Sequence, residues 1–269
     1  MKPYLEVHPW SVVESNWDAA NVRRSESIFS IGNGRFGQRA NFEELYSGDS
    51  LRGSYVAGVY YPDKTRVGWW KNGYPEYFAK VLNATNWIAI HADVQGEAVD
   101  LARAKSVDRF RRELDMQRGV LSREVELTLQ SGSQIRIEAE RFCSMARPDV
   151  AAMRYRIVAL TDGLEVALKP GLDGDVFNED SNWDDAFWDV EAVDASAADG
   201  TALVVNSTLK TAFTVGTAMV AVHATDAQAL SDPALDVAGN RALIARSAQL
   251  EKGQWVEAIK FVGLVSSLH

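Results

Sequence analysis

The residues best suited to ligand binding lie in one aromatic stretch, residues 60–78, which reads YYPDKTRVGWWKNGYPEYF. Prolines and glycines interrupt it and disfavour regular structure. Sugars present flat C–H faces framed by hydroxyl groups, and rigid aromatic rings beside cationic and amide side chains suit such ligands. The alternative is a compact surface loop that its own rings pin to the domain. The side chains expected to contact a sugar are Tyr61, Lys64, Trp69, Trp70 and Tyr74.

No pattern of residues predicts catalysis or a metal site. The four histidines, at positions 8, 91, 223 and 269, are far apart and none lies in a motif. The sequence has no nucleophile elbow, no phosphate-binding P-loop and no metal-ligand cluster. We therefore predict no catalytic residue, no metal and no cofactor for this chain.

Three further motifs have plain structural interpretations. The spacing Gly-Asn-Gly-x-x-Gly at residues 32–37 is typical of a tight turn rather than a dinucleotide loop, because no helical pattern follows it. Glu43 and Glu44 are adjacent, would point to opposite faces of a strand, and are expected to pair with Arg35, Arg39 or Arg52. The acidic stretch 171–189 does not fit a calcium-binding loop and is expected to be a solvated loop.

Composition limits the function classes. The chain has 269 residues, a net charge of -9 and one cysteine, Cys143. The negative charge argues against nucleic acid and against an anionic membrane surface as partners, and one cysteine excludes an internal disulfide framework. Residues 1–10 lack the apolar core of a signal peptide, and no apolar run reaches 18 residues, so we expect a cytoplasmic location.

The positioning elements are predicted to be β-strands. Short alternating runs recur about every ten residues between turn signals, for example at 135–142 and 255–265. Residues 106–129 are expected to form a hairpin that turns at 117–119, residues 28–31 a short strand, and residues 191–200 a mobile loop. This pattern predicts an all-β fold, a large antiparallel two-sheet sandwich with few helices, over residues 1–269 as a single domain.

Four stretches resemble the N-terminal domain of glycoside hydrolase family 65. They are ESIFSIGNGRFGQRANFEE at 26–44, the long run GSYVAGVYYPDKTRVGWWKNGYPEYFAKVLNATNWIAI at 53–90, the LDM-x-x-G-x-L-x-R element at 114–123, and the RF-x-SM element at 141–145. The first two are long and specific, and the last two are weak alone. Arg35 departs from the aromatic residue of many members, which indicates a sub-branch.

The resemblance implies a fold and a parent activity. The family domain is a β-sandwich similar to the galactose-mutarotase fold, and it precedes an (α/α)6 barrel that carries the general acid and the phosphate site. Family chemistry is inverting phosphorolysis of a disaccharide, with inorganic phosphate as co-substrate. The resemblance therefore implies a non-catalytic domain that supports the barrel, a homodimer and the rim of the active site in a phosphorylase, most simply one for maltose.

Two other functions stay open at this point. The chain could be a free-standing carbohydrate-binding module, which sugar affinity without a barrel would favour. It could also be an aldose epimerase, because that fold is shared, but such an enzyme needs a His/Glu set that the sequence does not bring together from His91 and His223.

Overall fold

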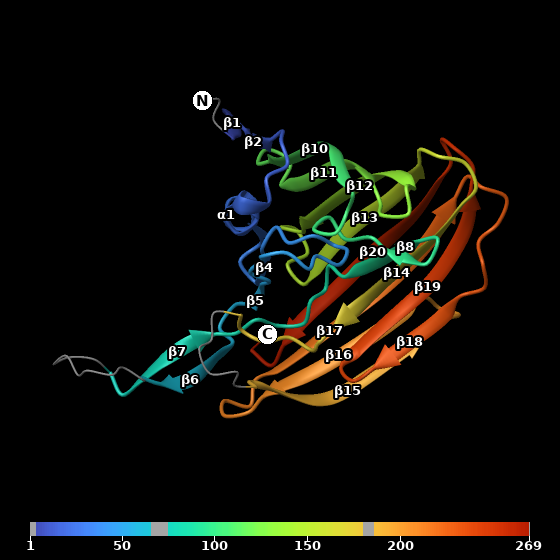
Figure 1. Cartoon of the computed structure of the whole chain (residues 1–269). Helices are drawn as coiled ribbons and strands as arrows, with labels where there is room; N and C mark the ends of the chain where they lie inside the picture. The colour runs from blue at the N-terminus through green and yellow to red at the C-terminus, as the bar shows by residue number, and fades with distance from the viewer. Residues whose placement is uncertain (1–3, 66–74, 180–185, 269) are drawn as a thin grey trace.

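The computed structural model describes residues 4–65, 75–179 and 186–268, and it folds them mainly into antiparallel β-sheet (Figure 1). The fold class expected from the sequence is confirmed: two stacked sheets form a sandwich, and the helical segments are short. None of the helices in the described ranges has the length and apolar character needed to cross a bilayer.

The larger sheet has ten strands. Their spatial order is β1 (Leu5–His8), β2 (Ser11–Glu14), β10 (Ser106–Asp115), β11 (Val120–Thr128), β12 (Gln134–Cys143), β13 (Val150–Ala159), β20 (Trp255–Ser266), β17 (Thr214–Thr225), β16 (Thr201–Thr208) and β15 (Trp188–Ser196). The predicted hairpin between β10 and β11 is confirmed, and Gly119 has φ 66° in its turn, a left-handed conformation that glycine adopts readily.

The second sheet has five strands and covers part of the first (Figure 1). Its order is β18 (Ala234–Ala238), β19 (Arg241–Leu250), β14 (Leu164–Asp173), β8 (Ile90–Val94) and β9 (Glu97–Ala98). Inward side chains alternate along its strands, as Val166 and Leu168 do on β14. They pack with Val125 and Ile137 of the larger sheet in one apolar core, whose burial is the main favourable contribution to folding.

A buried lysine joins the two sheets. Lys260 on β20 is fully buried, and its Nζ donates hydrogen bonds to the carbonyl oxygens of Ala89 at 2.8 Å and Gly171 at 2.9 Å. Burial holds the pKa of Lys260 well below its usual value. These bonds fix the end of the five-stranded sheet against the larger one.

Smaller elements lie at one end of the sandwich (Figure 1). They are the 3-10 turn η1 (Ala19–Asn21), the helix α1 (Val22–Ile28), a three-stranded sheet and a two-stranded hairpin. The small sheet contains β3 (Ile31–Gly32), β4 (Phe36–Gln38) and β5 (Ser54–Val56), and the hairpin contains β6 (Tyr60–Lys64) and β7 (Tyr77–Val81). Asn33 holds the β3–β4 turn: its Nδ2 donates to Ser144 and Pro148 carbonyls, and its Oδ1 accepts from two backbone N–H groups.

Two expectations about local structure are wrong. Residues 22–28 form a helix, and the strand expected at 28–31 shrinks to Ile31–Gly32; Val22, Ser25, Glu26 and Phe29 are buried at helical spacing. The expected mobile loop at 191–200 is mostly β15, an edge strand that pairs with β16 despite its Ala- and Asp-rich composition. Pairing with a neighbouring strand outweighs weak local β-propensity.

Candidate functional site

Two of the predicted sugar-binding residues, Tyr61 and Lys64, lie on β6 of the hairpin β6–β7, which projects from the sandwich in Figure 1. Tyr61 is buried against Phe187, with ring centroids 4.9 Å apart, and Lys210 lies 4.6 Å above the same ring. Lys64 is exposed and lies 3.9 Å from Glu76. Trp69, Trp70 and Tyr74 lie outside the described residues. In the structure, the Tyr61 ring therefore packs inside the domain and the Lys64 side chain is exposed to solvent. Sugar binding by Tyr61, Lys64, Trp69, Trp70 and Tyr74 stays a prediction.

An apolar groove follows the base of this hairpin. Its lining includes Phe36, Val56, Val59, Tyr60 and Val81 from the small sheet and the hairpin. Tyr60, Val81 and their neighbours Tyr77 and Phe78 are exposed. The last described residue, Leu268, also lies here, because a Cβ on Gly58 would be 2.7 Å from its Cδ1. The groove and the end of the described chain thus share one face.

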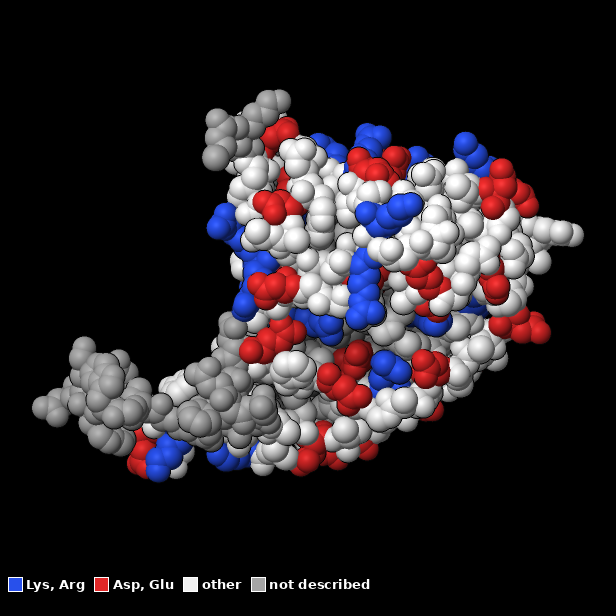
Figure 2. All heavy atoms as spheres, in the orientation of Figure 1, with Lys and Arg blue, Asp and Glu red and all other residues white. Residues whose placement is uncertain are grey.

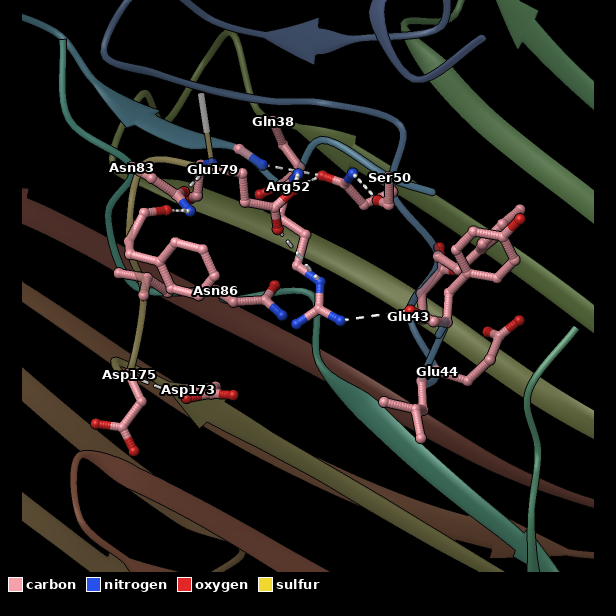
Figure 3. Close-up of a pocket in the computed structure, with 18 of the residues that line it drawn as sticks. Gln38, Glu43, Glu44, Ser50, Arg52, Asn83, Asn86, Asp173, Asp175 and Glu179 are labelled. Carbon is pink, nitrogen blue, oxygen red and sulfur yellow. Dashed lines mark hydrogen bonds and ion pairs between the residues drawn. The ribbon is translucent and has the colours of Figure 1, made fainter. Parts of the chain in front are cut away.

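A polar pocket lies between three connections that meet at one end of the five-stranded sheet (Figure 3). They are residues 38–54 between β4 and β5, residues 83–91 leading into β8, and residues 173–179 after β14. The cavity volume is about 60 Å³, several times the ~10–15 Å³ that one water molecule needs. On the face shown in Figure 2, acidic and basic side chains are interspersed around a hollow.

Each of the three connections forms one wall of the pocket, and buried arginines fix the first wall, residues 38–54. Arg123 on β11 donates to Glu44 at 2.7 and 2.6 Å and to Glu43 at 2.7 Å, and Arg141 on β12 pairs with Glu43. Burial alone would raise the pKa of Glu43, but the charges of Arg141 and Arg123 outweigh it and hold that pKa below its usual value. The prediction that Glu43 and Glu44 pair with Arg35, Arg39 or Arg52 is wrong. The 38–54 connection folds back onto the larger sheet, where it meets Arg123 and Arg141 instead.

Figure 3 shows side chains that line the pocket. The Arg52 guanidinium and the Asn86 amide face one another across it, and Asp173 and Asp175 lie at the end of β14. Arg52 is held from its backbone, whose N–H donates to Glu179 at 3.2 Å, and from its Nη2, 3.5 Å from the Tyr46 carbonyl. The exposed ring of Phe177 also lines the pocket.

Several polar atoms of the wall have no partner among the described residues. The buried Oε1 of Gln38 and the buried Oγ of Ser54 accept or donate no hydrogen bond. Asn86 uses its Oδ1 to accept from the Ile88 N–H at 3.3 Å, and its Nδ2 makes no bond to the described chain. A buried polar group without a partner costs about 1–3 kcal/mol. Such atoms make this wall suited to a ligand with both donors and acceptors.

Burial also shifts the charges around the pocket. It raises the pKa of Asp173, an effect that the hydrogen bond from the Asp175 N–H partly offsets, and it raises the pKa of Glu179 in the same way. Burial lowers the pKa of His91, and the charges of Arg241 and Lys169 add to that effect. His91 is therefore neutral at pH 7 and can both donate and accept a hydrogen bond.

The two histidines of the epimerase alternative have separate surroundings. His91 lines the polar pocket, whereas His223 on β17 lies 3.3 Å from the carbonyl oxygen of Leu168. Burial lowers the pKa of His223 to about 4. Within the described ranges, no group of three or more His, Cys, Asp or Glu side chains is placed to hold a metal ion.

The sequence alone did not predict this polar pocket. Its lining comes from segments up to about 140 positions apart in the sequence. Only two parts of it stand out in the sequence, the acidic stretch at 171–189 and the Glu43–Glu44 pair, and the sequence favours a structural interpretation of both. The remaining sequence signal for the pocket was the frequency of Asn and Ser near strand ends, but these residues are also common in ordinary turns.

Comparison with known proteins gives one family. Residues 12–269 match the sequence model described as "Glycosyl hydrolase family 65, N-terminal domain". The chain is 45% identical over 196 residues to "Maltose phosphorylase" of Bacillus subtilis (strain 168), covering 73% of this chain and 26% of that protein. It is 31% identical over 173 residues to "Kojibiose phosphorylase" of Halothermothrix orenii, covering 64% of this chain and 20% of that protein.

Two further relatives cover nearly the whole chain. "Alpha,alpha-trehalose phosphorylase" of Thermoanaerobacter brockii is 26% identical over 279 residues, which are 99% of this chain and 35% of that protein. The solved structure described as "Putative kojibiose phosphorylase from human microbiome" superposes with a TM-score of 0.83 at 23% identity, over 98% of this chain and 33% of that chain. That structure supports the fold. The chain spans between a fifth and about a third of the length of these relatives.

Proposed function

The chain belongs to glycosyl hydrolase family 65 through that family's N-terminal domain, and from this premise we propose that it is the non-catalytic N-terminal domain of a disaccharide phosphorylase. The observation that carries the proposal is the match over residues 12–269 together with 45% identity to a maltose phosphorylase. The parent reaction would be inverting phosphorolysis of an α-glucoside such as maltose, with inorganic phosphate as co-substrate and a carboxylic acid that protonates the leaving oxygen.

In this proposal the apolar groove at the base of β6–β7 receives the downstream part of the protein, an (α/α)6 catalytic barrel. The support is positional: Leu268 lies against Gly58 beside the groove, and the relatives are about four to five times as long as the matched region. The exposed Tyr60, Tyr77, Phe78 and Val81 supply apolar surface for that contact. Contiguous apolar surface of this kind typically marks an interface.

Further parts of the proposal concern the assembled enzyme. The loop with Trp69, Trp70 and Tyr74, next to Tyr61 and Lys64, would reach the rim of the active site and contact the disaccharide. The domain would also support a homodimer, in the cytoplasm. The acidic net charge of -9 favours neither nucleic acid nor anionic lipid as a partner.

Product release tests the non-catalytic role. The purified chain in phosphate buffer is expected to release no glucose 1-phosphate from maltose, trehalose or kojibiose, because the barrel carries the general acid. The full-length enzyme with Trp69→Ala, Trp70→Ala or Tyr74→Ala should show a raised KM for its disaccharide, and Trp10→Ala, on another exposed turn, serves as control. Turnover by the isolated chain would overturn the domain assignment, and an unchanged KM would remove the loop from the active-site rim.

A further inference from the structure

The polar pocket between residues 38–54, 83–91 and 173–179 has no role in the proposed function. It is built from rigid parts: the first wall is tied to the larger sheet by Arg123 and Arg141, and the start of β8 and the end of β14 are both held by Lys260. A hydrogen bond also joins the first two walls: Asn83 Oδ1, in the 83–91 connection, accepts from the Ser54 N–H at 2.8 Å. A pocket with fixed walls binds at lower entropic cost than one that must order.

The charges around the pocket favour a neutral ligand. The carboxylates of Glu43 and Glu44 are paired with Arg123 and Arg141 behind the lining. The other lining carboxylates are those of Asp173, Asp175 and Glu179, and Arg52 is the lining residue with a permanent positive charge. This balance disfavours phosphate and other anions. A divalent cation needs several converging oxygen ligands, and the described part of the chain offers no group of three acidic, histidine or cysteine side chains in such an arrangement.

The hydrogen-bonding groups favour hydroxyls. A hydroxyl is both donor and acceptor, and the lining of the pocket offers groups of both kinds. Gln38 Oε1 and Ser54 Oγ have no partner among the described residues, and Ser54 Oγ can donate or accept. The Asp173 carboxylate adds an acceptor and Asn86 Nδ2 adds a donor. The Arg52 guanidinium has five N–H donors, and its contacts to the Tyr46 carbonyl at 3.5 Å and to Glu179 at 3.9 Å leave some of them for a ligand. Phe177, 60% exposed, adds an aromatic face to the same lining. Neighbouring hydroxyls on a ring with an apolar C–H face match this set of groups.

We propose that the polar pocket is a binding site for one neutral hexopyranose ring, formed entirely by the N-terminal domain. Asp173 and Asn86 contact neighbouring ring hydroxyls, Ser54 and Gln38 bond a hydroxyl at the buried end, and Phe177 lies against the C–H face. Arg52 closes the open side from its anchor on Glu179 and the Tyr46 carbonyl. The site would let the domain hold a sugar independently of any downstream barrel.

Calorimetry and amide spectra of the purified 269-residue chain test this, with D-glucose, maltose and glycerol as probes. A single pyranose in an open pocket is expected to bind with a dissociation constant on the order of 1 mM. The amide signals of Gly53, Ser54 and Asp175 should shift with the same saturation. Glycerol has hydroxyls but no ring and should not saturate the site.

Two variants separate binding from folding. Ser54→Ala removes a hydroxyl that has no protein partner, so the chain should fold as before and bind glucose about three- to tenfold more weakly. Asp173→Asn keeps the shape of the side chain and should weaken binding at least as much. Thr217→Val is the matched control: it removes another buried hydroxyl without a partner, on β17 and outside the pocket, and should leave affinity unchanged.

Three results with the sugar and glycerol probes would overturn the proposal. They are the absence of saturable glucose or maltose binding, binding that Ser54→Ala and Asp173→Asn leave unchanged, and equal binding of glycerol. Binding of CaCl2 or MgCl2 in place of sugar would also overturn it. Failure here is distinct from failure of the proposed function, which is measured by product release with phosphate present and by KM in the full-length enzyme.

Discussion

Arg123 offers the sharpest test of what holds the 38–54 loop in place. Its guanidinium makes three charge-assisted hydrogen bonds, two to Glu44 and one to Glu43, and all three side chains are at most 4% exposed. Arg123→Met would leave the Glu44 carboxylate buried without a cationic partner among the described residues, while Arg141 still pairs with Glu43. Removing one partner of such a buried pair typically destabilises a protein by about 3–5 kcal/mol.

Urea unfolding followed by tryptophan fluorescence measures this loss. The expected result is a midpoint lowered by about 1–2 M with an unchanged slope, since the slope grows with chain length and a chain of 269 residues should lie near the upper end of the usual range of about 1–3 kcal/mol per molar urea. Adding Glu44→Gln to Arg123→Met should recover part of the loss, because the uncompensated charge is then gone. Arg109→Met is the matched control: Arg109 lies 3.6 Å from Glu124 with side chains 63% and 39% exposed, and such surface pairs contribute about 0–1 kcal/mol.

The result that would refute this reasoning is a loss below about 1 kcal/mol for Arg123→Met, equal to that of the control. It would mean that the two carboxylates are hydrated or protonated in the folded chain. A change in the slope instead of the midpoint would point to an altered denatured state.

Two further predictions concern single polar side chains. His223 has a pKa lowered by burial from 6.5 to about 4; the unfolded chain then binds more protons between these values, so stability should fall as the pH drops from 6.5 to 4, by at most roughly 3 kcal/mol. His223→Gln should flatten that part of the stability profile measured by urea unfolding at each pH, and an identical profile would contradict the assignment. Asn33→Ala removes the bonds to Ser144, Pro148, Arg35 and Phe36 and should lower stability by about 2–4 kcal/mol. Thermal unfolding measures it, with Asn21→Ala as control, because among the described residues the half-buried Asn21 side chain bonds only the nearby Asp18 and Arg24. Equal melting temperatures for both variants would count against the anchoring role.

The sequence by itself determined the fold class. The alternation in residues 135–142 and the turn at Gly119 have direct counterparts in β12 and the β10–β11 hairpin, because side-chain direction in a strand repeats every two residues whatever the strand pairs with. The family resemblance over 26–44 and 53–90 was also available from residues alone, and the match over 12–269 confirms it.

Only the tertiary structure decided which polar groups meet. Glu43 and Glu44 bind Arg123 and Arg141, which lie about 80 to 100 positions away, rather than the arginines nearby in sequence. The composition of 191–200 resembles a loop, yet strand pairing makes most of it β15. The polar pocket likewise combines residues near 40, 86 and 175. Contacts of this range depend on how the sheets stack and where the connections cross their ends, which local periodicity does not encode.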